Sequence, residues 1–157
     1  MIDLTQIRGT GVEVIVASIG ATLSAQLFKI VWYTLSHGKL NFRIFFHTGG
    51  MPSSHSACMT AMATSVGLID GFSSTSFAVG FALALVVMYD AAGVRRAAGR
   101  MAGILNKMTE DFYQHHPDMI PERLRELLGH TPTEVLVGAF WGCALAYGLH
   151  LRLSALL

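Results

Sequence analysis

The sequence predicts an all-α integral membrane protein: a helical bundle of about four hydrophobic helices plus a cytoplasmic amphipathic segment. Hydrophobic residues make up 52% of the 157 residues and charged residues only 13%, and the mean hydropathy is +0.50. The charges also gather between long apolar runs. This distribution is typical of helices that cross a bilayer, and it excludes an ordinary soluble domain.

Four segments are apolar enough to cross or deeply enter a bilayer, because about 20 residues at 1.5 Å each span its hydrocarbon core. We expect the spans at approximately 12–35, 53–69, 77–94 and 135–151, within a single domain covering residues 1–157. The second segment is short and polar at its start. Its alternative interpretation is a buried helix that enters the bilayer only part of the way. In the basic loop 95–131, the first part extends the third helix and PERLRELLGH is typical of a short amphipathic helix.

The positions of lysine and arginine predict the orientation. With four spans, the loops 37–52 and 95–131 share one side and carry eight of these residues, against two, Arg8 and Arg152, on the other. Positive charge is enriched in cytoplasmic loops. We therefore expect both basic loops in the cytoplasm and both termini outside, in a bacterial-type plasma membrane or an organelle membrane.

Four polar clusters stand at helix ends, and this topology puts all of them on the cytoplasmic side. Ionisable residues at membrane depth are costly and usually face a protein interior, so we expect the clusters to converge. They are Lys29 near the end of the first span, GGMPSSH (49–55) opening the second, Asp90 with Arg95 and Arg96 closing the third, and GHTPTE (129–134) opening the fourth.

The cluster that opens the second span suits an anion. Gly50, one of two consecutive glycines, permits close approach of the backbone to a ligand. The first N–H groups of the helix, together with the Ser53 and Ser54 hydroxyls, can hold negative charge, and His55 lies in the same turn. An ordinary capped helix with an interfacial histidine explains the same residues.

The cluster that opens the fourth span pairs His130 with Glu134, four residues later. If helical geometry holds at His130, the carboxylate can orient the imidazole. Thr131 to Glu134 also match a capping box, which explains Glu134 without chemistry, and both interpretations can hold at once.

The other two clusters have simpler interpretations. Arg95 and Arg96 can anchor the helix on the cytoplasmic side, with Asp90 paired to one of them. For Lys29 the plain reading is a side chain that reaches out to the interface.

Three motifs, GGMPSSHSA, DAAGVRRAAGRMAGILN and LRELLGHTPTEVLVG, together resemble the divergent branch of the type 2 phosphatidic acid phosphatase superfamily, which includes vanadium-dependent haloperoxidases. The resemblance covers nearly the whole chain, including AQLFK around Lys29. It implies a phosphohydrolase that needs no metal or other cofactor, with His130 as nucleophile, Glu134 orienting it and His55 protonating the leaving group. It also implies a phosphate cradle formed by Ser53, Ser54 and basic side chains, with Lys29 as the lysine of the first motif.

The sequence departs from the superfamily pattern in two places. The arginine expected six residues before His130 is replaced by Leu124, which leaves Arg95 or Arg96 for that role. The first motif also lacks the Arg-Pro pair that usually follows its lysine. Both departures concern residues of the expected phosphate site.

The leading hypothesis is hydrolysis of a lipid phosphate monoester or diphosphate through a phosphohistidine. The alternatives are a catalytically silent membrane protein that binds or transports phosphorylated lipids, and a purely structural bundle. Expected partners are a phosphorylated lipid substrate and membrane lipids, but no nucleic acid. Four helices are few for enclosing a pocket and a lipid groove, so we also expect a homodimer. One sequence does not identify the interface residues, although Gly80, Ala84 and the glycines of the fourth span permit close packing.

Overall fold

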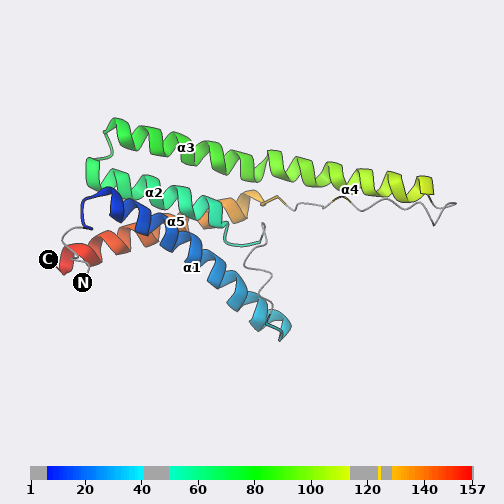
Figure 1. The fold of residues 1–157 in the computed structure, drawn as a ribbon, viewed down its shortest axis with the longest axis horizontal. Helices are drawn as coiled ribbons and strands as arrows, with labels where there is room; N and C mark the ends of the chain where they lie inside the picture. The colour runs from blue at the N-terminus through cyan, green and yellow to red at the C-terminus, as the bar shows by residue number, and fades with distance from the viewer. Residues whose placement is uncertain (1–6, 41–49, 114–123, 125–128, 157) are drawn as a thin grey trace.

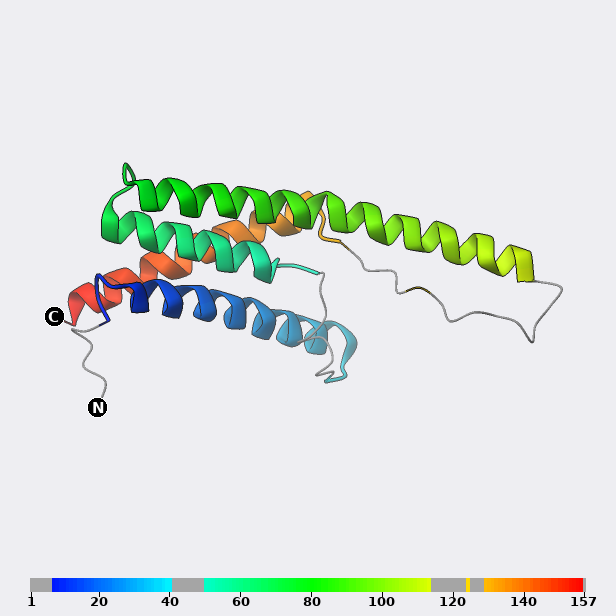
Figure 2. The same cartoon turned by 45° about the horizontal axis from the view of Figure 1, so that its top comes forward.

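The computed structural model describes residues 7–40, 50–113, 124 and 129–156. These residues form five helices: α1 (Gly11–His37), α2 (Ser54–Asp70), α3 (Thr75–Ala92), α4 (Val94–Tyr113) and α5 (Pro132–Ala155). Helices α1, α2, α3 and α5 lie side by side and alternate in direction along the chain (Figures 1 and 2). The prediction of an all-α membrane bundle is confirmed.

Three helical runs are long and apolar enough to cross a membrane. They are Gly11–His37, Thr75–Asp111 and Pro132–Ala155. The second of these joins α3 to most of α4. The predicted third span, 77–94, thus corresponds to α3, and the expected extension of that helix into the basic loop is α4.

The short helix α2 is the centre of the bundle. It has only 17 residues, about 26 Å at 1.5 Å per residue, and it packs against α1, α3 and α5. Since α1 and α3 point the same way, α2 returns the chain between them (Figure 2). Three neighbours shield it from lipid, which explains why a helix rich in serine, threonine and alanine is stable at this position.

Small residues bring the helices of the bundle close together. Alanines recur every four residues on the buried face of α1, and the fully buried set is Ala17, Ala21, Ala25, Ala57, Ala61 and Ala146. On α5, a Cβ atom at Gly142 would overlap the Ala57 carbonyl and the Thr60 hydroxyl of α2. The Thr60 hydroxyl lies 2.8 Å from the Ser56 carbonyl of its own helix and 3.0 Å from the Ala139 carbonyl of α5. Close approach is therefore a requirement of the α2–α5 contact.

Small residues of α3 and α5 also permit close packing against α2. A Cβ atom at Gly80 would lie 3.6 Å from the Ala63 Cα of α2, and Ala84 is buried as well. A Cβ atom at Gly138 would overlap the Ser53 backbone. The close packing that these residues permit is thus present within the chain.

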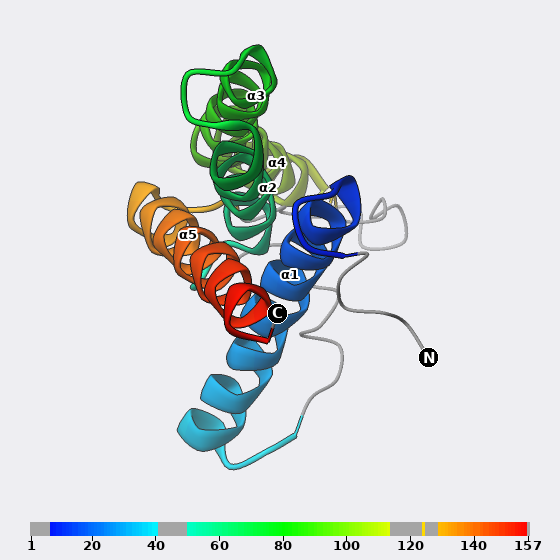
Figure 3. The same cartoon turned by 90° about the vertical axis from the view of Figure 1, so that its left-hand side faces the viewer.

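The basic loop is helical in its first part. Gly93 separates α3 from α4, which runs on past the bundle (Figures 1 and 2). Seen from the end, α2 lies between α3 on one side and α1 and α5 on the other (Figure 3). The predicted amphipathic helix PERLRELLGH falls mostly on residues 121–123 and 125–128, which lie outside the described residues. Its Leu124 is described: the backbone N–H donates to the Asn106 side-chain oxygen at 3.0 Å, and the carbonyl accepts from the Asn106 amide at 2.9 Å.

Candidate functional site

The first turns of α2 and α5 are joined at one end of the bundle. The N–H of Ser53, the residue that caps α2, donates to the Glu134 carbonyl in the first turn of α5 at 3.1 Å. The buried Ser53 hydroxyl accepts from the N–H and the hydroxyl of Ser56, at 3.4 and 3.0 Å. The predicted capping role of Ser53 is therefore present. Because a hydroxyl accepts two hydrogen bonds and donates one, the Ser53 O–H still has a proton to donate.

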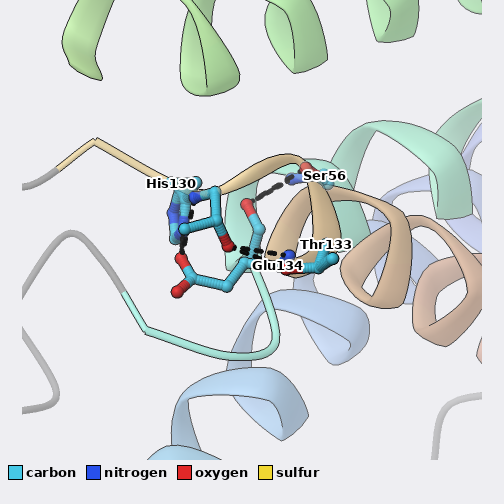
Figure 4. A network of polar contacts seen from close by, with 6 residues as sticks. Ser56, His130, Thr133 and Glu134 are labelled. Carbon is cyan, nitrogen blue, oxygen red and sulfur yellow. Dashed lines mark hydrogen bonds and ion pairs between the residues drawn. The ribbon is translucent and has the colours of Figure 1, made fainter.

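His130 and Glu134 contact each other directly (Figure 4). The distance from His130 Nδ1 to Glu134 Oε2 is 2.9 Å. The same carboxylate oxygen accepts from the Thr131 N–H at 3.3 Å, which completes a capping box with Pro132 in the first turn. His130 precedes the helix, so the premise of helical geometry at this residue is wrong. The carboxylate reaches His130 because the capping box turns the Glu134 side chain back toward the start of the helix. Glu134 therefore caps the helix and contacts His130 at the same time.

The contact with Glu134 determines the tautomer of the neutral His130 ring. An ionised carboxylate only accepts hydrogen bonds, so Nδ1 carries the proton, and in the neutral ring Nε2 keeps a lone pair. The His130 side chain is buried, with the residue 3% exposed, and its Nε2 atom has no hydrogen-bond partner among the described residues. A buried polar atom without a partner is unusual in a folded protein and often marks a site with a function.

Lys29 supplies positive charge to the same region. It lies on the buried face of α1 and is 6% exposed. Its Nζ atom also has no hydrogen-bond partner in the described part of the chain, while the Glu134 carboxylate attracts it electrostatically. The alternative in which Lys29 reaches out to the interface is therefore wrong. Gln26, one turn earlier, presents a further buried atom without a partner, and its spacing of three residues from Lys29 was the signal that could have identified it.

The end of α3 also meets the start of α5. The His130 N–H donates to the Ala91 carbonyl at 3.1 Å, and Asp90 is half-buried beside Ala91. Arg96 is exposed on α4. The side chain of Arg95 lies outside the described residues. The structure thus brings the ends of α2, α3 and α5 together with Lys29 of α1, but it does not bring Arg96 into their contacts.

His55 and Gly50 occupy more open positions. His55 is in the first turn of α2, as expected, but its side chain is exposed, unlike that of His130. Ser54, by contrast, is buried. Gly50 has a φ of +76°, a left-handed conformation that favours glycine. The described residues contain no group of three His, Cys, Asp or Glu side chains that could hold a metal ion.

A second histidine–glutamate pair lies at the opposite end of the bundle and was missed in the sequence. His150 Nδ1 is 2.7 Å from Glu13 Oε1, and the Gly9 N–H donates to the other carboxylate oxygen at 2.8 Å. Glu13 is fully buried. The available signal was one acid and one histidine, each within an apolar span and each near the same membrane face. This pair connects the start of α1 to the end of α5.

Comparison with known proteins identifies the family. Residues 11–145 match the model of the Divergent PAP2 family. The chain belongs to this family. The uncharacterized membrane protein YuiD of Bacillus subtilis (strain 168) is 39% identical over 141 residues, which cover 83% of this chain and 89% of the relative. No solved structure matches. The resemblance drawn from the three motifs is confirmed, and the matched region contains Lys29, Ser53, His130 and Glu134.

Proposed function

We propose that this protein is a membrane phosphohydrolase that removes phosphate from a lipid phosphate monoester or diphosphate through a phosphohistidine. The observation that carries the proposal is the buried His130 imidazole, whose Nδ1 contacts Glu134 while Nε2 has no hydrogen-bond partner in the part of the chain that the structure describes. A neutral imidazole oriented by a carboxylate is suited to nucleophilic attack. Membership of the Divergent PAP2 family supports the same class of chemistry.

In the first step, His130 Nε2 attacks phosphorus, an N–P bond forms and the bond from phosphorus to the leaving oxygen breaks. His55, as the imidazolium, gives its proton to that oxygen. In the second step, a water oxygen attacks phosphorus, the N–P bond returns its electron pair to Nε2, and the water proton passes to His55. Glu134 holds the His130 ring through both steps and stabilises the positive charge that the ring gains.

The surrounding groups stabilise the charge on the phosphoryl oxygens, which is the larger share of catalysis in phosphoryl transfer. The unpartnered Lys29 ammonium supplies positive charge at membrane depth. The Ser53 O–H and the first-turn N–H groups of α2 act as hydrogen-bond donors, with Ser54 beside them. Arg95 and Arg96 are candidates for the role of the arginine that the superfamily has six residues before the nucleophilic histidine. A site at the end of a membrane bundle suits a substrate whose head group leaves the bilayer while its tail stays in lipid.

Phosphate release by the reconstituted protein tests the proposal. The substrates are phosphatidic acid, phosphatidylglycerophosphate and a polyprenyl diphosphate, and the variant is His130→Ala. Loss of a covalent nucleophile is expected to lower the rate by about a thousandfold or more. His37→Ala, which changes an exposed histidine near the same end of α1, is the control and should keep wild-type rates. Wild-type phosphate release by the His130 variant would show that the assignment is wrong.

The alternative function is binding or transport of phosphorylated lipids without turnover. The exposed side chain of His55 favours it, because the proposed acid does not lie buried together with His130. In proteoliposomes, movement of a phosphorylated lipid between leaflets without phosphate release supports this alternative. The cytoplasmic position of the site and the homodimer remain predictions.

A further inference from the structure

The helix α4 has an apolar face that nothing in the described chain covers. It makes little contact with α1, α2 or α5 and extends past the bundle (Figures 1 and 2). Its large apolar side chains are between 49% and 62% exposed. They are Val94, Met101, Ile104, Leu105 and Met108, whose spacing of three, four and seven residues places them on one face of a helix.

Basic side chains flank this apolar face. Arg96, Arg100 and Lys107 are exposed, and at 3.6 residues per turn they fall together on one side of the opposite, polar face. The acids of α4, Glu110 and Asp111, stand only near its end. A helix with an apolar face and a basic polar face is typical of one that lies in the interface of a membrane.

The position of α4 relative to the membrane agrees with this pattern. The 18 residues of α3 cover about 27 Å at 1.5 Å per residue, close to the thickness of the hydrocarbon core. Helix α4 therefore begins where the membrane surface is reached. Gly93 separates it from α3. Two glycines inside α4, Gly99 and Gly103, each weaken an isolated helix by about 1 kcal/mol relative to alanine, so α4 needs a surface to stabilise it.

We propose that α4 turns at Gly93 and lies on the anionic surface of the membrane that α3 crosses, with its apolar face toward the acyl chains. Arg100 and Lys107 then meet the negative lipid head groups, which attract basic residues next to a spanning helix. In the structure α4 instead continues the direction of α3 (Figure 2), so the proposal includes a bend at Gly93.

A second copy of the chain fits the apolar face of α4 less well than an anionic membrane surface does. Two copies in one membrane have the same orientation, so their α4 helices would run parallel. Pairing through the apolar face would leave Arg100 and Lys107 of each copy without acidic partners across the contact, because the acids Glu110 and Asp111 lie near the end of α4. An anionic lipid surface compensates these charges, and a second copy does not.

Site-directed fluorescence in vesicles tests the proposal. In a full-length background with Cys58→Ala and Cys143→Ala, single cysteines replace Met101, Met108 or Gly103 and carry an environment-sensitive dye. The vesicles are phosphatidylcholine with or without phosphatidylglycerol. With the anionic lipid, lipid-borne nitroxides should quench the dyes at Met101 and Met108, and aqueous iodide should quench the dye at Gly103, on the opposite face.

Charge variants test the electrostatic part. Arg100→Gln combined with Lys107→Gln should lower the equilibrium constant for surface binding about thirtyfold, or about fivefold for each charge removed. Asp111→Asn, which also removes one charge from α4, should preserve or strengthen binding.

Three results would overturn the proposal. The first is iodide access to Met101 and Met108 in anionic vesicles. The second is equal lipid quenching with and without phosphatidylglycerol. The third is protection of the dyes at Met101 and Met108 from iodide that depends on the protein-to-lipid ratio and is accompanied by dye self-quenching. That result would identify a second copy of the chain as the surface that covers α4.

Discussion

The contact between α2 and α5 leads to a prediction about Gly142. A Cβ atom at Gly142 would overlap the Ala57 carbonyl and the Thr60 hydroxyl. Neither can move away freely, because the carbonyl belongs to the backbone of α2 and the hydroxyl lies 2.8 Å from the Ser56 carbonyl of the same helix. In Gly142→Ala the two helices must separate. Overpacking of this kind costs about 1–3 kcal/mol.

Gly148→Ala is the matched control, because a Cβ atom at Gly148, on the same helix, meets no heavy atom within 4 Å. Both variants gain about 1 kcal/mol of helix propensity, so the difference between them isolates the clash at about 1–3 kcal/mol. For a chain of this size, that corresponds to an apparent Tm about 2–12 °C lower for Gly142→Ala than for Gly148→Ala.

The assay is the fraction of monodisperse protein that survives heating in detergent, measured by size-exclusion chromatography. Equal apparent Tm values for the Gly142 and Gly148 variants would refute the reasoning, because they would show that α2 and α5 are not in backbone contact at this position.

Three further predictions follow from the described contacts. Glu134→Gln should reduce phosphate release by the reconstituted protein about a hundredfold or more, since an amide no longer stabilises the imidazolium; unchanged release contradicts the orienting role. His150→Ala removes the partner of the buried Glu13 carboxylate and should destabilise the bundle by roughly 3 kcal/mol, seen as a lower apparent Tm; an unchanged Tm contradicts the pairing. In intact cells without native cysteines, an impermeant thiol reagent should label Ser73→Cys and not Lys39→Cys; the reverse result inverts the predicted orientation.

The order and approximate limits of the hydrophobic helices could be predicted from the pattern of apolar residues along the chain. The predicted spans 12–35, 77–94 and 135–151 lie close to α1, α3 and α5, because a bilayer requires each crossing segment to be apolar along its whole length. The second span was harder to predict, because that segment is short and is not apolar along its whole length. Its serines and threonines face other helices, and composition does not distinguish a polar helix shielded by protein from one that enters a bilayer only part of the way.

The capping chemistry of the site was also evident in the sequence, because capping is local. Thr131, Pro132 and Glu134 form the predicted capping box, and Ser53 caps α2. What spacing could not decide was whether Glu134 caps the helix or binds His130. The structure shows that one carboxylate oxygen does both, which depends on the path of the chain before the helix.

The sequence by itself determined that this is a membrane bundle of the Divergent PAP2 family, with its polar groups gathered at helix ends, because membrane burial and helix capping act over one segment at a time. Only the tertiary structure decided which polar groups are left without partners. Lys29 and His130 are far apart in the chain, and both are buried where the ends of different helices meet. Gly80, Gly138 and Gly142 likewise face α2 or its capping residue, because packing partners are set by how helices meet in space and not by their own sequences.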